Sequence, residues 1–168
     1  MTPTEAQTLA VSIRRYGPAD REAVRKLHDE ALHDEALHDV GAHLGDGPWD
    51  ADLDDIESVY LRAGGEFLVG VLEGEVVAMG ALRPNPDGRA WITRMRVSPR
   101  LHGRGIGQTL LDSLHRRADE LGYGTLHLHT TIGQTAARRL YEKYGYRETG
   151  RGTVGPFECL YYERKSGA

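Results

Sequence analysis

The stretch ITRMRVSPRLHGRGIGQTLLDSL, residues 92–114, decides the fold of this 168-residue chain. Ile92, Met95 and Val97, with Trp91 before them, predict a buried strand, which Ser98-Pro99 ends. Three glycines follow, and apolar residues then recur at helical spacing at positions 106, 110, 114, 118 and 121. A helix that begins within a glycine cluster presents N–H groups without intrahelical partners, and its dipole adds positive charge there. The stretch therefore predicts a strand, a turn and a helix that bind a phosphate-bearing ligand.

The spacing of Gly103, Gly105 and Gly107 excludes two common phosphate-binding motifs. A dinucleotide-binding G-x-G-x-x-G needs a glycine where Gln108 stands, and a P-loop needs a lysine after Gly107. The run that begins at His102 instead resembles Q/R-x-x-G-x-G/A, the acyl-CoA-binding motif of the GCN5-related N-acetyltransferases (GNAT superfamily), with His102 in the first position. On this motif alone, a glycine-rich turn before an ordinary helix remains the alternative.

A second match follows along the chain. Residues 126–129 alternate as a strand, and residues 134–146 (QTAARRLYEKYGY) read as a short helix that Gly145 stops. This pair resembles the later GNAT motif, a strand and then a helix that ends in L-Y-E-K-x-G-F/Y, with Gln134 where many members have Asn. Residues 157–165 resemble the last strand of the family, so the resemblance spans residues 11–165.

The resemblance implies an α+β fold with three layers, α/β/α. Its sheet is GNAT-like, mixed and mostly antiparallel, with a splayed central strand pair flanked by helices. Residues 11–165 are expected to form a single GNAT acetyltransferase domain, and residues 1–10 an N-terminal tail. The hydrophobic pattern predicts the order β-α-α-β-β-β-α-β-α-β-β, with the second helix at residues 50–62.

The resemblance also implies an activity, the direct transfer of an acetyl group from acetyl-CoA to an amine. Tyr141 stands where the family has its usual proton donor, and a phenol is protonated at pH 7. His129 ends its strand where many members have Glu, and is the candidate general base. The resemblance places the cofactor on Met95, Arg96, Val97, His102, Gly103, Arg104, Gly105, Ile106, Gly107, Gln108, Gln134 and Tyr141.

Alternatives remain open for each of these roles. His129 can be a structural strand histidine, with a water chain to an acidic side chain as the base, and Tyr141 can be a core residue. Two other classes of function also fit the sequence: a non-catalytic acyl-CoA sensor, and an adaptor whose acidic helix binds a basic protein.

Charge is unevenly distributed along the chain. Residues 20–57 hold 13 acidic and three basic side chains, whereas 16 basic and 11 acidic ones follow from residue 58. We expect the basic part to attract the anionic cofactor and the acidic part to attract a cationic amine acceptor. A solvated acidic surface is the alternative. A pentad repeat from Leu27 places successive histidines about 140° apart around a helix, so no metal site is expected there.

The composition excludes several classes of protein. There is no run of 18 apolar residues and no apolar leader, so neither a membrane span nor a secretion signal is expected. The single cysteine, Cys159, fits a reducing cytoplasm and is expected to be a small apolar residue of the last strand. Nucleic acid is not an expected partner, and the chain is expected to be a monomer or homodimer.

Overall fold

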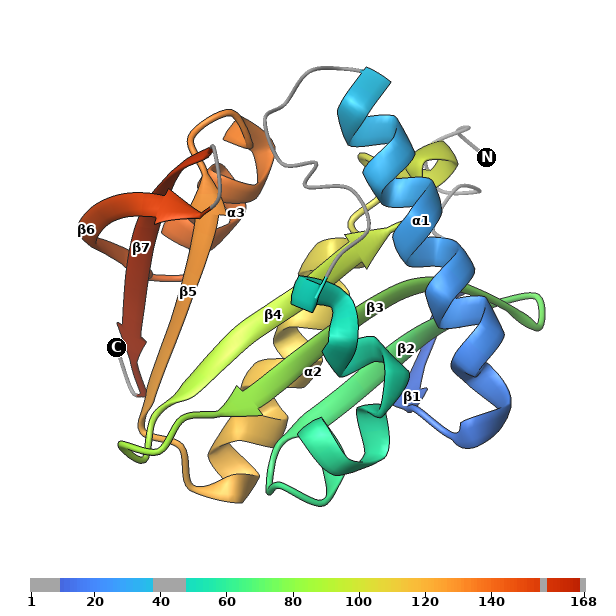
Figure 1. Ribbon diagram of the computed structural model, residues 1–168, viewed down its shortest axis with the longest axis horizontal. Helices are drawn as coiled ribbons and strands as arrows, with labels where there is room; N and C mark the ends of the chain where they lie inside the picture. Colours follow the sequence, from blue (N-terminus) through green and yellow to red (C-terminus); the bar gives the residue numbers. More distant parts are fainter. Residues whose placement is uncertain (1–9, 38–47, 155–156, 167–168) are drawn as a thin grey trace, which may run out of the picture.

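Seven strands form one mixed sheet within residues 10–37, 48–154 and 157–166, the part of the chain that the computed structural model describes. The strand order is β1-β2-β3-β4-β5-β7-β6 (Figure 1). The strands are β1 (Ser12–Arg15), β2 (Glu66–Leu72), β3 (Glu75–Pro84), β4 (Ala90–Val97), β5 (Thr125–Thr131), β6 (Arg147–Val154) and β7 (Phe157–Lys165). All neighbouring pairs are antiparallel except β4 and β5, which are parallel.

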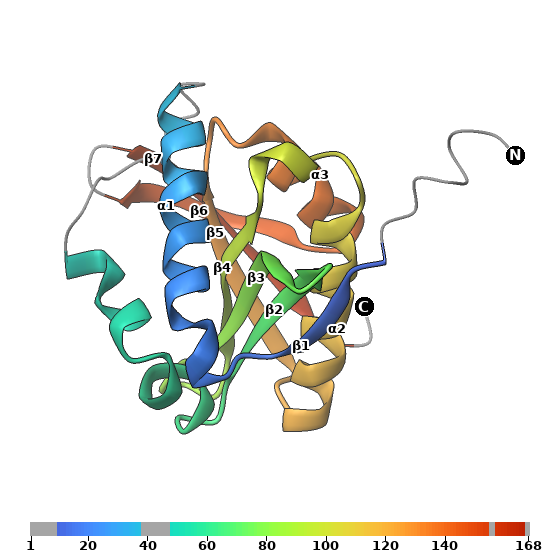
Figure 2. The ribbon, with the colours of Figure 1, turned by 90° about the vertical axis from the view of Figure 1, so that its right-hand side faces the viewer.

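Helices cover both faces of the sheet and complete the three layers (Figure 2). One face carries α1 (Arg21–Leu37) and the short helical segments η3 (Pro48–Asp54) and η4 (Glu57–Leu61). The other face carries α2 (Ile106–Leu121) and α3 (Thr135–Lys143). Short 3₁₀ turns, η2 (Pro18–Asp20) and η5 (Pro99–Leu101), precede α1 and α2.

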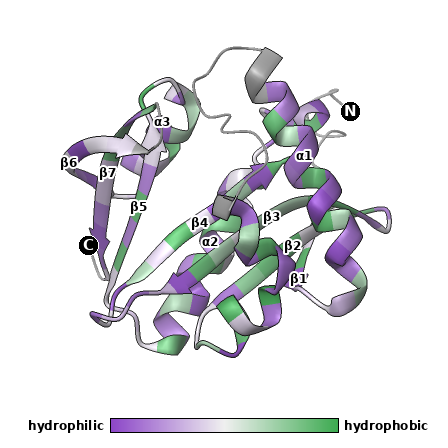
Figure 3. Cartoon of the chain, viewed as in Figure 1, coloured by the Kyte–Doolittle hydropathy of each residue, from purple (hydrophilic) through white to green (hydrophobic). Residues whose placement is uncertain are grey.

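Each face of the sheet has its own hydrophobic core. Leu110, Leu111 and Leu114 of α2 are completely buried against one face. On the other face, Tyr60 of η4 packs edge-on against Phe67 of β2, with 5.3 Å between the ring centroids. The hydrophobic colour follows the central strands, while α1 alternates between hydrophobic and hydrophilic residues along its length (Figure 3). This alternation is expected of a helix with one face on the sheet.

The parallel pair β4 and β5 is joined only at its beginning. Ala90 pairs with Leu126 and Trp91 with His127, and beyond these residues the two strands diverge (Figure 1). By contrast, β5 pairs with β7 from Thr125 to Thr131. The edge of β4 that faces β5 is therefore without ladder partners over most of the strand.

A bulge lies in the middle of β4, opposite Gly80 of β3. Met79 pairs with Arg96 and Ala81 with Thr93, so Gly80 faces two residues of β4, one of which, Arg94, has a φ of +57°. A bulge of this kind bends a strand and redirects a side chain. Glycine is favoured at position 80, because a Cβ there would lie 2.7 Å from the sulfur of Met95 and force that side chain to shift.

The predicted α+β fold, its three layers and its splayed strand pair are confirmed. The predicted helix at residues 50–62 is wrong, because the chain there forms two short segments, η3 with 3₁₀ geometry and η4 with π geometry. Aspartate has a low helix propensity, and the side chains of Asp50 and Asp52 bind Arg94 of β4 instead. The predicted tail, except Ala10, lies outside the described residues.

Candidate active site

Two glycines before α2 hold a backbone conformation that other residues rarely adopt. Gly103 and Gly105 both have a φ of +78°, and a Cβ on either would meet no atom within 4 Å. The backbone N–H of Thr109 donates a hydrogen bond to the carbonyl of Gly105 at 3.1 Å, which is the first hydrogen bond of the helix. The N–H groups of residues 106–108 come before it and have no partner within the helix. Open space beside a helix N-terminus with these free donors fits a phosphate group.

This loop forms one wall of a cleft of about 860 Å³, which we call the glycine-loop cleft. It lies between the end of β4, the start of α2 and α3. All twelve residues to which the sequence assigns the cofactor line it, namely Met95, Arg96, Val97, His102, Gly103, Arg104, Gly105, Ile106, Gly107, Gln108, Gln134 and Tyr141. The structure brings these residues together, and their roles in binding stay predictions.

Two parts of this cleft were not expected from the motifs. The ring of His102 is exposed, with its Nε2 3.1 Å from the carbonyl oxygen of Val97, so the side chain folds back on the end of β4. Ala31 and Asp34 of α1 line the cleft as well. No motif marks these two residues, because α1 reaches the cleft through its contacts with β4 and η5.

A second cleft, of about 850 Å³, opens where β4 and β5 diverge, and we call it the splay cleft. Its floor is formed by β4 and β5, and α1, η3, η4 and β7 contribute its walls. Its lining includes His28, Asp50, Asp52, Tyr60, Arg83, Trp91, Arg94, His129, Cys159 and Tyr161. The splay cleft shares Met95, Arg96, Gln134, Ala137 and Tyr141 with the glycine-loop cleft, so the two clefts meet at these residues.

Tyr141 lies at this meeting point, near the C-terminal end of α3. Its ring is 7% exposed and packs edge-on against Tyr146, with 5.7 Å between the centroids. Its hydroxyl makes no hydrogen bond within the described residues. Burial raises the pKa of Tyr141 to about 12, against a smaller opposite effect of the Arg96 charge. The phenol is therefore protonated at neutral pH and free to donate its proton.

Gln134 stands at the N-cap position of α3, and its side chain binds the end of β5 and not the helix. Its side-chain oxygen accepts hydrogen bonds from the hydroxyl of Thr130 at 2.7 Å and from the N–H of Thr131 at 3.2 Å. These bonds tie the beginning of α3, the helix that carries Tyr141, to β5.

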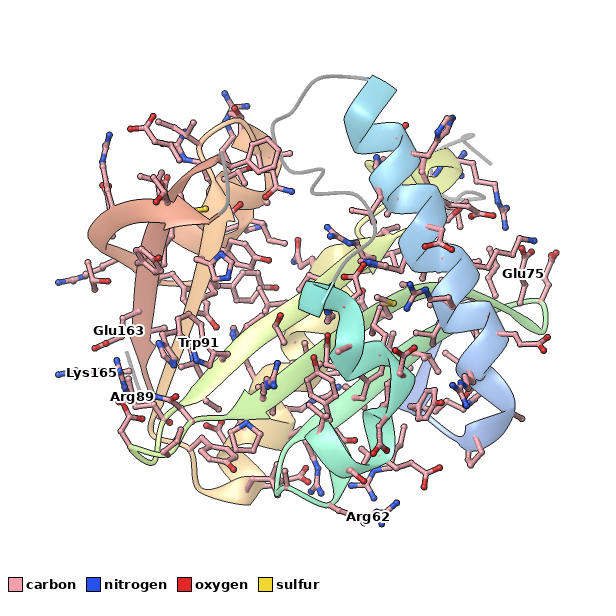
Figure 4. All side chains as sticks on the ribbon, in the orientation of Figure 1. Arg62, Glu75, Arg89, Trp91, Glu163 and Lys165 are labelled. Carbon is pink, nitrogen blue, oxygen red and sulfur yellow. The ribbon has the colours of Figure 1, made fainter. Side chains whose placement is uncertain are left out.

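His129 opens into the splay cleft from β5. Its ring lies edge-on to Trp91, with 5.8 Å between the centroids, and loss of hydration lowers its pKa. His127 is buried instead and stacks on Trp91 at 3.5 Å. Figure 4 shows Trp91 at the junction of β4 and β5, near Arg89 and Glu163. Of the two histidines, only His129 lines the splay cleft, and loss of hydration lowers the pKa of both rings, that of His127 to about 4.

A buried ionic network forms the wall of the splay cleft on the η3 side. Arg94 donates from its Nε to Asp52 at 2.9 Å and from an Nη to Asp50 at 3.1 Å. The hydroxyl of Tyr60 also donates to Asp52, and Nε2 of His28 lies 3.1 Å from Asp50. Burial raises the pKa of Asp52, but the hydrogen bonds from Arg94 and Tyr60 outweigh it and hold the pKa below its usual value.

Sequence reasoning missed this network. It treated Asp50 and Asp52 as part of a solvated or acceptor-attracting acidic segment, whereas both are buried and bound to Arg94. The only available signal was the alternation of aspartates, which does not identify a partner more than 40 residues away. Among the described residues, no group of three or more His, Cys, Asp or Glu side chains is arranged to hold a metal ion. The repeat beyond Leu37 lies outside them.

The sequence matches the acetyltransferase (GNAT) family over residues 23–146, and the chain belongs to this family of N-acetyltransferases. Human N-acetylaspartate synthetase is 37% identical over 101 residues, which are 59% of this chain and 33% of that protein. The chain thus spans about a third of the length of this relative.

Solved structures share the fold. An acetyltransferase of the GNAT family from Staphylococcus aureus Mu50 has a TM-score of 0.80 at 21% identity, covering 93% of this chain and 99% of its own. yncA from Salmonella typhimurium, solved with its cofactor acetyl-CoA, has a TM-score of 0.75 at 20% identity, covering 93% and 94% of the two chains. None of the helices in the described ranges has the length and hydrophobicity that crossing a membrane requires.

Proposed function

We propose that this chain transfers the acetyl group of acetyl-CoA directly to the amine of a small acceptor that binds in the splay cleft. The observation that carries the proposal is the meeting of the two clefts at Tyr141 and Gln134. A ligand in the glycine-loop cleft and a ligand in the splay cleft have access to the same phenol. This is the arrangement that a transfer between two substrates needs.

The glycine-loop cleft fits acetyl-CoA, which supplies a thioester whose carbonyl carbon is open to an amine and whose sulfur leaves as a thiolate. The N–H groups of residues 106–108 bind its phosphates. Beyond Trp91, the edge of β4 has no ladder pairs with β5, so its backbone can bind an amide-bearing chain as it would bind another strand.

Two side chains move the protons. The cationic amine first loses one proton to solvent, and Nε2 or Nδ1 of His129 then accepts a second proton from the neutral attacking nitrogen as the C–N bond forms; the lowered pKa keeps the ring neutral beforehand. The hydroxyl of Tyr141 gives its proton to the sulfur as the C–S bond breaks. The products are the acetylated amine and the free thiol, and no bond to the enzyme forms.

The acceptor is the part of this proposal that the family leaves open. The name of the human relative, N-acetylaspartate synthetase, makes aspartate the first amine to test. The amine of such a molecule is a cation before it reacts, and the acidic half of the chain would attract it. We propose that the enzyme works in the cytoplasm as a monomer or homodimer.

An acceptor panel tests the proposal. The full chain is incubated with acetyl-CoA and single amines, including aspartate, while a thiol reagent follows CoA release and mass spectrometry identifies the acetylated product. Release that depends on an amine and matches the product in amount is expected. Calorimetric binding of CoA without transfer to any amine would refute the proposal and indicate an acyl-CoA sensor.

A further inference from the structure

One arginine of the splay cleft has a position that the acetyl-transfer chemistry does not use. Arg83 lies near the end of β3 and pairs across the sheet with Trp91 of β4. Cross-strand partners place their side chains on the same face of a sheet. Arg83 and Trp91 therefore stand side by side in the lining of the splay cleft, and Arg83 is exposed there.

The guanidinium of Arg83 packs on the Tyr60 ring, and its charge helps to lower the pKa of Asp52. Its carbon atom lies 6.0 Å from the centroid of the Tyr60 ring, a cation–π contact that leaves the N–H groups at its edge available. Within the described part of the chain, Arg83 makes no ion pair and no hydrogen bond. Arg94, by contrast, already binds Asp50 and Asp52.

The carboxylates of the cleft are less accessible than Arg83. Asp50 and Asp52 are both buried and both accept hydrogen bonds from Arg94, and Asp52 accepts another from Tyr60, while Oδ2 of Asp50 is buried without a hydrogen-bond partner among the described residues. The splay cleft therefore offers an incoming molecule an exposed cation, whereas its two aspartates are buried beside Arg94. A forked guanidinium is matched in shape and charge by a carboxylate, which accepts two of its hydrogen bonds.

We infer that the acceptor is an amine that also carries a carboxylate, an amino acid, and that Arg83 binds this carboxylate. The inference rests on the proposed function and adds to it the class of acceptor and the residue that selects it. Arg83 lies on β3, whereas His129 and Tyr141 lie on β5 and α3 across the same cleft. A carboxylate bound at Arg83 leaves the amine to face the proton-transfer groups. Arg83 is thus a specificity residue and has no part in the proton transfers.

The test compares amino acids with their neutral, isosteric α-amides and side-chain amides as acceptors. Wild type, R83Q and R83K are measured beside R62Q, which removes an exposed arginine that lines neither cleft and lies at the outer end of η4 (Figure 4). Two readouts are taken: kcat/KM for each acceptor, and calorimetric binding of each acceptor in the presence of CoA. Arg83 is exposed, so R83Q is expected to fold, and an unchanged KM for acetyl-CoA confirms this.

We expect wild type and R62Q to prefer one acid over its amide by about 10- to 100-fold, the usual value of a charge-assisted pair. R83Q should lose that preference, mainly through KM, and R83K should keep part of it. An unchanged acid-to-amide ratio in R83Q, or a wild type that prefers amines without a carboxylate, overturns the inference. Arg83-dependent binding of acids without any turnover would support the inference and refute the proposed function.

Discussion

Replacing Tyr141 by Phe removes one hydroxyl from the point where the two clefts meet. The ring is almost fully buried and its edge-on packing against Tyr146 does not depend on the hydroxyl. The hydroxyl makes no hydrogen bond within the described residues, so its loss leaves no partner unpaired. We therefore expect the free energy of unfolding to change by less than about 1 kcal/mol and the affinity for CoA to stay the same.

The rate of acetyl transfer should change far more. Burial raises the pKa of Tyr141 to about 12, so the wild-type phenol holds its proton throughout the neutral range. Loss of a general acid lowers a rate by about 10²- to 10⁴-fold, which corresponds to about 3–5 kcal/mol of transition-state stabilisation. The KM for acetyl-CoA should not follow this change, because the hydroxyl is used in the transition state and not in binding.

A single-turnover assay is the right measurement, because product release limits kcat in many transferases and would hide a slower chemical step. Tyr144→Phe is the control, since Tyr144 is the C-cap residue of the same helix and lines neither cleft. If Tyr141→Phe carries out the chemical step at the wild-type rate, Tyr141 is not the proton donor and solvent protonates the thiolate.

Three further predictions concern the frame of the site. Gly105→Val should weaken CoA binding at least 10-fold in calorimetry, which is about the effect of losing one phosphate contact. The control is Gly122→Val at the other end of α2, where φ is +85°; it should show similar backbone strain and normal CoA affinity. Gly80→Ala should lower the free energy of unfolding in urea by about 1–3 kcal/mol, because the new Cβ would press on Met95. In the control, Gly124→Ala, the new Cβ would have no atom within 4 Å, and the free energy of unfolding should change by less than about 0.5 kcal/mol. Burial lowers the pKa of His115 to about 4, so as the pH falls the unfolded state binds this proton before the folded state does. The free energy of unfolding should therefore fall by up to about 3 kcal/mol as the pH drops from 6.5 to 4. A His115→Gln protein whose free energy of unfolding falls equally steeply over this range would contradict the prediction.

The parts of the site that could be predicted from the sequence depend on local chemistry. The glycines at 103 and 105 predict a positive φ and a helix N-terminus with open space beside it. The helix containing Tyr141 is predicted by the spacing of its apolar residues and by the glycine that ends it. The remaining parts depend on which distant segments meet. Arg94 reads as an ordinary strand residue, and nothing nearby shows that it sits in a bulge or binds Asp50 and Asp52. Strand register and tertiary ion pairs decide such positions, and neither is encoded in a short window.

The bulge and the ionic network depend on each other. A φ of +57° at Arg94 costs about 1–3 kcal/mol, so it persists only where the surroundings hold it. Asp50 and Asp52 hold it, since their burial would be strongly unfavourable without a bound guanidinium. Neither the positive φ of Arg94 nor the burial of the two aspartates is favourable without the other. The η3 wall of the splay cleft is therefore expected to form when the chain folds, before an acceptor binds. Among the described residues of the cleft, Arg83 and His129 make no hydrogen bond to this network, so selectivity is expected to depend on Arg83 and base catalysis on His129.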